Sequence, residues 1–319
     1  WYVYVSGGAI LLLTLLWPKL LKELTTKQVF LFFTACFVSF GLLLIFLTSF
    51  AGRDDAGTVF KGAVQFNAGN FSLIKPGAYF FRYPHQLGLL SFERLVLYLI
   101  PLPVISVFYV LNLGMVIGMN YATWKITEEL FQRPLVSRTA VIMSFGFLPL
   151  VFNIMFAYGL MYGLFFASFA ILFFLRYLRR GKVRNAILSV LMLTLAYWVR
   201  SNNIILIIAL SGILILLTLR EKRYRYLLLV LAFFAFPMSL HKATTSYYEI
   251  TTHQKIPGTP QIAWLAMGLQ DEPDSKRMPG WYTGYVRDIY AKKKGNIEKI
   301  EKSANHLFDK RVQYLLAHP

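Results

Sequence analysis

The chain is dominated by long runs of apolar residues that carry almost no charge. Seven of these runs occupy residues 29–50, 102–121, 139–156, 160–175, 186–199, 204–219 and 227–240, and another occupies residues 1–16. A helix needs about 20 apolar residues to cross a bilayer. Only 15% of the residues are charged, against about 25% in soluble domains. The sequence therefore predicts an all-α polytopic membrane protein with about eight spans. Some runs are short, and those near Arg200 are expected to form half-helices or tilted pairs.

Basic segments between the apolar runs predict how the helices are oriented. Lys and Arg gather at residues 125–138, 176–184 and 220–225, and cytoplasmic loops are enriched in these residues. Placing all three segments inside also places residues 19–27 inside, and it leaves residues 51–101 outside. The net charge of +18 has two compatible interpretations. It is loop charge that fixes the topology, or a basic field that attracts anionic lipid or a phosphate-bearing substrate.

Cysteine usage, charge placement and the first residues constrain the class of protein further. The single cysteine, Cys36, lies inside an apolar run, so it allows no internal disulfide and no thiolate metal cluster. Nucleic acid is not an expected partner, because the basic residues lie in short loops and not on one soluble face. No basic region precedes the first apolar run, so we expect no cleavable signal peptide. The sequence begins at Trp1 without Met, and we expect a fragment or a processed product.

The outer loop, residues 51–101, is expected to contain two helices. The first covers residues 55–67 and lies on the membrane surface, with three apolar side chains on one face, Val59, Ala63 and Phe66. Glycines and a proline then indicate a loop. Pro84 favours a helix start, so the second helix is expected over residues 85–100.

A second long segment, residues 242–319, is also expected outside the membrane. It holds 8 of the 15 acidic residues, and it ends in an amphipathic helix over residues 296–317. We therefore divide the chain into a transmembrane bundle over residues 1–241, which includes the outer loop, and an extracytoplasmic segment over residues 242–319.

Asp54 and Asp55 are the only aspartates among the first 270 residues. They follow the second apolar run at its outer end. One interpretation is structural, since Asp is a favoured residue at the start of a helix. The other is functional, because ionisable groups at the edge of a membrane bundle tend to mark sites. A carboxylate at that position could act as a general base or as a metal ligand.

The outer loop also carries a motif that resembles a known family. After Asp55 come Tyr79-Phe80 and then Tyr83-Pro84-His85-Gln86-Leu87-Gly88. The pattern resembles the first outer loop of GT-C class membrane glycosyltransferases, and more closely a Gram-positive branch related to protein mannosyltransferases. Where this chain has His85-Gln86, that branch usually has Asn-Asn. Both pairs can form hydrogen bonds with a sugar or a phosphate.

Three later segments are similar to the same branch. They are the break Trp198-Val199-Arg200-Ser201-Asn202-Asn203, the run of residues 263–270, and the stretch of residues 281–288. The basic turn at residues 176–184 is similar as well. Members of the class continue into further spans and a tail, so the resemblance implies that this chain is incomplete at its C-terminus.

The resemblance implies a reaction at the outer face of the cell membrane. A sugar arrives on a polyprenyl phosphate, a carboxylate deprotonates the acceptor hydroxyl, and the sugar is transferred with inversion. Asp55 is the expected base and Asp54 its alternative. Arg200, with Asn202, is expected to hold the lipid phosphate. The residues expected to bind substrate are Lys75, Arg82, Tyr83, His85 and Gln86.

The remaining partners and the competing functions stay open at this point. A glycan or a wall polymer such as teichoic acid is the acceptor that the resemblance implies. Some members of the class need a divalent metal ion and others do not. A transporter or flippase of lipid-linked sugars is a competing hypothesis, although neither inverted repeats nor deep polar breaks are evident. A non-catalytic subunit of a polysaccharide assembly complex is another, and it predicts that loss of Asp55 is harmless.

Overall fold

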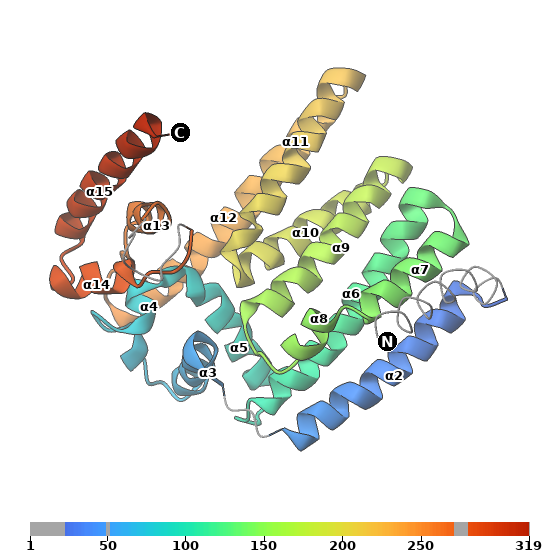
Figure 1. Cartoon of the computed structure of the whole chain (residues 1–319), viewed down its shortest axis with the longest axis horizontal. Coiled ribbons are helices and arrows are strands. Elements are labelled where there is room, and N and C mark those ends of the chain that lie inside the picture. Colours follow the sequence, from blue (N-terminus) through green and yellow to red (C-terminus); the bar gives the residue numbers. More distant parts are fainter. Residues whose placement is uncertain (1–22, 49–51, 271–279, 319) are drawn as a thin grey trace, which may run out of the picture. The chain divides into compact units, whose positions relative to one another are not determined.

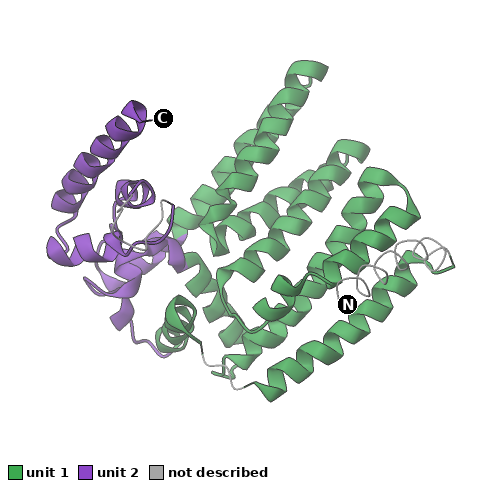
Figure 2. Cartoon of the chain, viewed as in Figure 1, with its two compact units in different colours: residues 1–67, 88–243 green, residues 68–87, 244–319 purple. Residues whose placement is uncertain are grey.

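The computed structural model describes residues 23–48, 52–270 and 280–318. These residues form helices and connecting turns, and no strand occurs among them (Figure 1). The expected all-α fold is confirmed for this part of the chain. Two compact units are present: unit 1 comprises residues 1–67 and 88–243, and unit 2 comprises residues 68–87 and 244–319 (Figure 2). The apolar run expected to span the membrane at residues 1–16 lies outside the described residues.

Unit 1 contains the apolar helices. In chain order they are α2 (Thr26–Leu47), α3 (Asp54–Asn67), α5 (Leu87–Leu99, in this unit from Gly88), α6 (Ser106–Phe131), α7 (Pro134–Phe145), α8 (Leu148–Asn153), α9 (Gly159–Arg180), α10 (Val183–Val199), the 3-10 turn η3 (Ser201–Asn203), α11 (Ile204–Glu221) and α12 (Arg225–Thr252, in this unit to Ala243). Helix α9 packs against α10 and α6, while α7 packs against α6 and α2 (Figure 1). Buried side chains from α9 to α12 form one core, which includes Ala170, Phe174, Leu193, Leu210 and Phe233.

Among the residues that the structure describes, four helices are long and apolar enough to cross a membrane. They are α2, α9, α12 and the stretch Ser201–Glu221, which joins η3 to α11. Helices α7 and α8 add a fifth span if they are taken together, although a bend of 46° separates them. Many large apolar side chains on these helices are exposed, and Phe46 and Leu47 of α2 are 82% and 79% exposed. Apolar surface of this extent indicates contact with lipid.

Of the roughly eight predicted spans, the one at residues 1–16 lies outside the described residues, among which four or five helices meet the length and composition of a span. Helix α10 has 17 residues, or about 25 Å, which lies at the short end of the roughly 17–25 residues of a membrane span. Helix α6 is long, but it carries the polar residues Asn112 and Asn120, both of which are buried. The amide of Asn112 donates to the carbonyl oxygens of Ile154 (2.9 Å) and Phe156 (3.2 Å). Protein contacts inside the bundle thus satisfy a donor that lipid could not.

Unit 2 is built from turns, several short helices and one helix of 21 residues, α15. Its elements are η1 (Ser72–Ile74), α4 (Tyr79–Arg82), η2 (Pro84–Gln86), the end of α12, α13 (Gln261–Gly268), α14 (Tyr285–Lys292) and α15 (Ile297–Ala317). Its core joins α13, α14 and α15 through six buried side chains, Ala263, Met267, Val286, Ile289, Ile300 and Ala304. The amphipathic helix expected over residues 296–317 is confirmed, but Leu315 of its expected apolar face is 44% exposed.

The helices expected in the outer loop are present, with changed bounds. Helix α3 buries Val59, Ala63 and Phe66, as its periodicity predicts. The second helix begins at Leu87 and not at residue 85, because Pro84 opens a separate 3-10 turn. Residues 68–87 lie in unit 2 and not in the apolar bundle. Helix α12 continues to Thr252 through Pro237, so the chain stays helical well beyond the end of its apolar run.

Candidate functional site

Asp54 and Asp55 lie in the exposed first turn of α3. The backbone carbonyl of Arg53 accepts the amide of Gly57 (3.1 Å), and that of Asp54 accepts the hydroxyl of Thr58 (2.9 Å). Within the described residues, neither carboxylate has an ion pair or a hydrogen bond to a backbone amide. The helix dipole nevertheless favours negative charge in this first turn. Both carboxylates are thus open to solvent and to a ligand.

A pair of glycines shapes the approach to α3. A Cβ atom on Gly57 would lie 2.5 Å from the carbonyl oxygen of Gly52, so the two backbones touch. Asp54 has a positive φ of 49°, which few residues other than glycine adopt. At the other end of the helix, Arg94 donates to Asn67 (3.0 Å) and Asn67 donates back to the carbonyl of Arg94 (3.1 Å). Helix α3 is thus fixed to α5 at its C-terminal end.

Arg200 lies at the break between α10 and α11. Its guanidinium carbon is 5.2 Å from the ring centre of Tyr158, which is a cation–π distance. The side chain of Asn203 donates to the carbonyls of Ala196 (2.9 Å) and Arg200 (3.1 Å). Asn203 therefore satisfies the carbonyls that the broken helix exposes. Asn202, which we expected beside the phosphate, is exposed.

Three glycines bring neighbouring helices against this break. A Cβ atom on Gly88 of α5 would lie 1.8 Å from the carbonyl oxygen of Trp198. On α9, a Cβ atom at Gly159 would lie 2.5 Å from the carbonyl oxygen of Val199, and one at Gly163 would lie 3.0 Å from Cβ of Arg200. Only glycine permits such approaches. Helices α5 and α9 therefore fix the position of Arg200.

The interior of unit 1 contains an acidic residue that sequence reasoning missed. Glu93 of α5 is fully buried, and neither carboxylate oxygen has a hydrogen-bond partner among the described residues. Tyr162 of α9, next to Gly163, is also fully buried with an unpartnered hydroxyl, and its ring centre is 4.7 Å from that of Phe92. Burial raises the pKa of Glu93 well above its ordinary value. One feature of the sequence could have pointed to Glu93, because it is the only acidic residue between Asp55 and Glu128.

In unit 2, the motif of residues 79–88 meets the later run of residues 263–270. The ring of Trp264 lies 5.8 Å from that of Tyr83 and 6.1 Å from that of His85. The backbone amide of Thr259 donates to the carbonyl of Arg82 (3.0 Å). Two segments that carry the resemblance, far apart in the sequence, thus form one surface of aromatic and polar side chains.

Arg82 gives that surface a positive charge. Its guanidinium carbon lies 5.2 Å from the ring centre of Tyr83 and 5.9 Å from that of Tyr290. The Nε atom of Arg82 is buried and has no hydrogen-bond partner within the described ranges. We call Arg82, Tyr83, His85, Trp264 and Tyr290 the aromatic cluster.

The other expected substrate-binding residues are Gln86, which lies beside His85, and Lys75, which follows η1. The side-chain amide of Gln86 is 3.4 Å from Nε2 of His85. Lys75 is exposed just after η1, where its carbonyl accepts the amide of Ala78 (2.9 Å). The stretch of residues 281–288 reaches the later run as well, since the hydroxyl of Thr283 donates to the side chain of Gln270 (2.9 Å).

The expected site residues therefore fall into two sets. Asp54, Asp55, Arg200 and Asn202 belong to unit 1, and the substrate-binding residues belong to unit 2. Comparison with protein-family models, curated proteins and solved structures gave no match. Three or more His, Cys, Asp or Glu side chains that could hold a metal ion are not found together in residues 23–48, 52–270 and 280–318.

Proposed function

We propose that the chain is a membrane glycosyltransferase that moves a sugar from a polyprenyl-phosphate donor to a glycan or wall-polymer acceptor at the outer face of the cell membrane. One observation carries the proposal. The aromatic cluster joins two of the sequence segments that resemble GT-C enzymes, and it combines ring faces, polar groups and a cation. Aromatic faces pack against the apolar face of a sugar ring, while Arg82 and His85 can bind hydroxyl or phosphate oxygens.

The exposed carboxylate of Asp55 is the proposed base. It removes the proton of the acceptor hydroxyl, and the hydroxyl oxygen attacks the anomeric carbon of the donor sugar. A bond forms between that carbon and the acceptor oxygen while the bond from the carbon to the phosphate oxygen breaks. The leaving group is polyprenyl phosphate, which keeps the bonding electrons. Attack opposite the leaving group inverts the anomeric configuration.

Arg200 is the proposed partner of the lipid phosphate. Its guanidinium is held over Tyr158 and its backbone is fixed by Asn203 and by the glycines of α5 and α9. A planar guanidinium can hold two phosphate oxygens at once, whereas the ammonium of Lys is a point charge. Arg200→Lys should therefore lose transfer activity even though the charge is kept.

The test of the proposal uses the purified chain in detergent with a polyprenyl-phosphate sugar and an oligosaccharide acceptor. Release of polyprenyl phosphate and formation of the new glycoside are measured together. Trp264→Ala should reduce transfer at least tenfold, because it removes the ring that faces both Tyr83 and His85. Tyr314→Ala is the control, because Tyr314 is an aromatic residue that is 47% exposed on α15 of the same unit, outside the segments that carry the resemblance. Equal activity of the two variants, or lipid-linked sugars that do not accumulate when the gene is deleted, would contradict the proposal.

A further inference from the structure

A pocket with a strongly basic lining lies where α9 turns into α10. The cavity has a volume of about 240 Å³ and is lined by Phe173, Arg176, Arg180, Lys182, Arg184, Asn185 and Leu188. We call it the α9–α10 pocket. Four of these side chains are cationic, and no acidic side chain of the described residues lines the cavity. From sequence, this basic segment has two compatible interpretations, charge that sets the topology or a field that attracts anionic lipid or phosphate, and the first requires neither a cavity nor fixed side chains.

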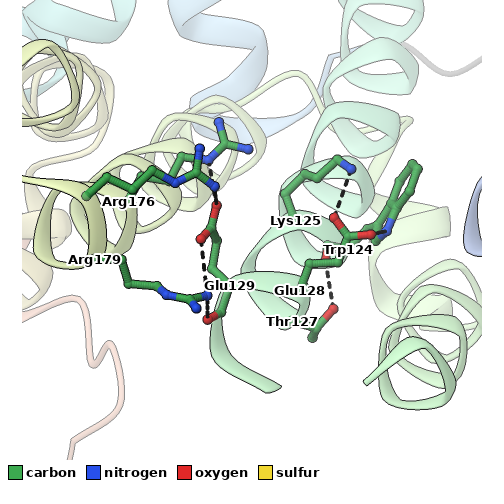
Figure 3. A network of polar contacts seen from close by, with 8 residues as sticks. Trp124, Lys125, Thr127, Glu128, Glu129, Arg176 and Arg179 are labelled. Carbon is green, nitrogen blue, oxygen red and sulfur yellow. Dashed lines mark hydrogen bonds and ion pairs between the residues drawn. The ribbon is translucent and has the colours of Figure 1, made fainter. Parts of the chain in front are cut away.

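One buried glutamate holds the arginines in place. The side chain of Glu129 is 8% exposed and accepts a hydrogen bond from Nε of Arg176 (3.1 Å). It also pairs with Arg179 (3.4 Å) and Arg180. Figure 3 shows the carboxylate of Glu129 between the guanidinium groups of Arg176 and Arg179. One carboxylate therefore meets three guanidinium groups, and the cluster keeps an excess of positive charge.

The neighbouring acid does not relieve that excess. Both oxygens of Glu128 are used on its own helix, by Nε1 of Trp124 (2.6 Å) and by Nζ of Lys125 (2.9 Å). Lys182 and Arg184 have no acidic partner in the described parts of the chain. The positive charge of the pocket is thus available to a ligand.

Arg176 is set up to bind an oxyanion. Glu129 occupies its Nε group, and the ring of Phe173 lies 6.0 Å from its guanidinium carbon. Within the described residues no hydrogen bond of its two terminal nitrogens is found, and both can meet a ligand in the planar geometry that matches phosphate oxygens. Because the side chain is already ordered, binding loses less conformational entropy there.

The pocket is separate from the proposed active site. It lies at the N-terminal end of α10, whereas Arg200 follows the C-terminal end of the same helix. The 17 residues of α10 place these ends about 25 Å apart. Apolar side chains, Phe173 and Leu188, line the pocket beside the cations, which suits a molecule that carries both a phosphate and an apolar part.

We propose that the α9–α10 pocket binds a phosphate group, and that the source is the headgroup of an anionic phospholipid. The inference does not depend on the glycosyltransferase function. A free phosphate compound would satisfy the same cations, so the experiment has one arm for each source.

The experiment measures binding to the purified chain in detergent by calorimetry at low salt. The probes are monomeric dihexanoyl phosphatidylglycerol, zwitterionic dihexanoyl phosphatidylcholine and inorganic pyrophosphate. The test variant is Lys182→Gln with Arg184→Gln, which leaves the ion pairs of Glu129 intact. The control is Arg220→Gln with Lys222→Gln, which removes the same charge from the next basic turn.

Each cation beside an anionic lipid surface contributes about 1 kcal/mol to the free energy of binding. A change of about 1.4 kcal/mol corresponds to a tenfold change in affinity. The test variant should therefore bind phosphatidylglycerol tenfold or more weakly, while the control changes less than twofold and phosphatidylcholine binds weakly throughout. Binding of pyrophosphate alone would keep the phosphate site and overturn the lipid source. Equal weakening in both variants, or no binding of any probe to the wild type, would overturn the site.

Discussion

Replacing Gly88 by alanine tests the packing that positions Arg200. A Cβ atom at Gly88 would lie 1.8 Å from the carbonyl oxygen of Trp198, about 2 Å closer than an ordinary contact. Backbone atoms on both sides must move, and overpacking of this kind costs about 1–3 kcal/mol. For a unit of this size, 1 kcal/mol corresponds to a change in the unfolding midpoint of about 2–4 °C. The Gly88→Ala variant should thus unfold about 2–12 °C below the wild type.

Gly114→Ala provides the matched control. A Cβ atom at Gly114 of α6 would meet nothing within 4 Å, and alanine in a helix interior is favoured over glycine by about 0.5–1 kcal/mol. This variant should unfold at or slightly above the wild-type temperature. Both midpoints are measured in one detergent, by circular dichroism at the helical band. A Gly88→Ala variant as stable as the wild type would refute the contact of α5 with Trp198.

Two further predictions concern a buried carboxyl and the orientation of the chain. Glu93→Gln should flatten the pH dependence of stability. An unfolded glutamate titrates near pH 4.3, and burial raises the pKa of Glu93 in the folded state. Above about pH 4.3 the folded state therefore binds more protons than the unfolded state. The free energy of unfolding of the wild type thus falls as pH rises. Unfolding midpoints from pH 5 to pH 8 should decline more steeply for the wild type, and parallel curves would contradict the assignment. In a chain with Cys36 replaced, a cysteine at Lys255 should react with an impermeant maleimide on intact cells while one at Lys182 should not; equal reaction would refute the proposed orientation.

Local sequence patterns were enough to predict part of the fold. The 3.6-residue periodicity around Val59 and Ala63 correctly predicted the buried face of α3, because a short helix against one surface needs only one apolar stripe. Composition alone failed for α12, where apolar character ends near Leu240 but the backbone stays helical to Thr252. A segment can form a helix without contacting lipid. An apolar run therefore predicts where a helix contacts lipid, but it does not predict where that helix ends.

The candidate site was harder to predict because it depends on non-local contacts. The sequence singles out the run of residues 263–270 by its resemblance, but nothing in it places the ring of Trp264 beside Tyr83 and His85. Glu93 lies on a helix whose existence could be predicted, but its burial depends on packing between α5 and α9. Asn203 and Asn202 are adjacent and chemically identical, and only the backbone at the break shows which one satisfies its carbonyls.

The central claim is most directly tested by the rate of sugar transfer in the Asp55→Asn variant. The change is nearly isosteric and removes a carboxylate that has no ion pair among the described residues, so folding and insertion should be retained. Loss of a general base lowers the rate by about 10²–10⁴-fold. With a polyprenyl-phosphate sugar donor in vesicles, Asp55→Asn should lose activity on that order and Asp54→Asn should lose less. The reverse ranking would move the base to Asp54, and full activity of both variants would contradict a catalytic role for this pair.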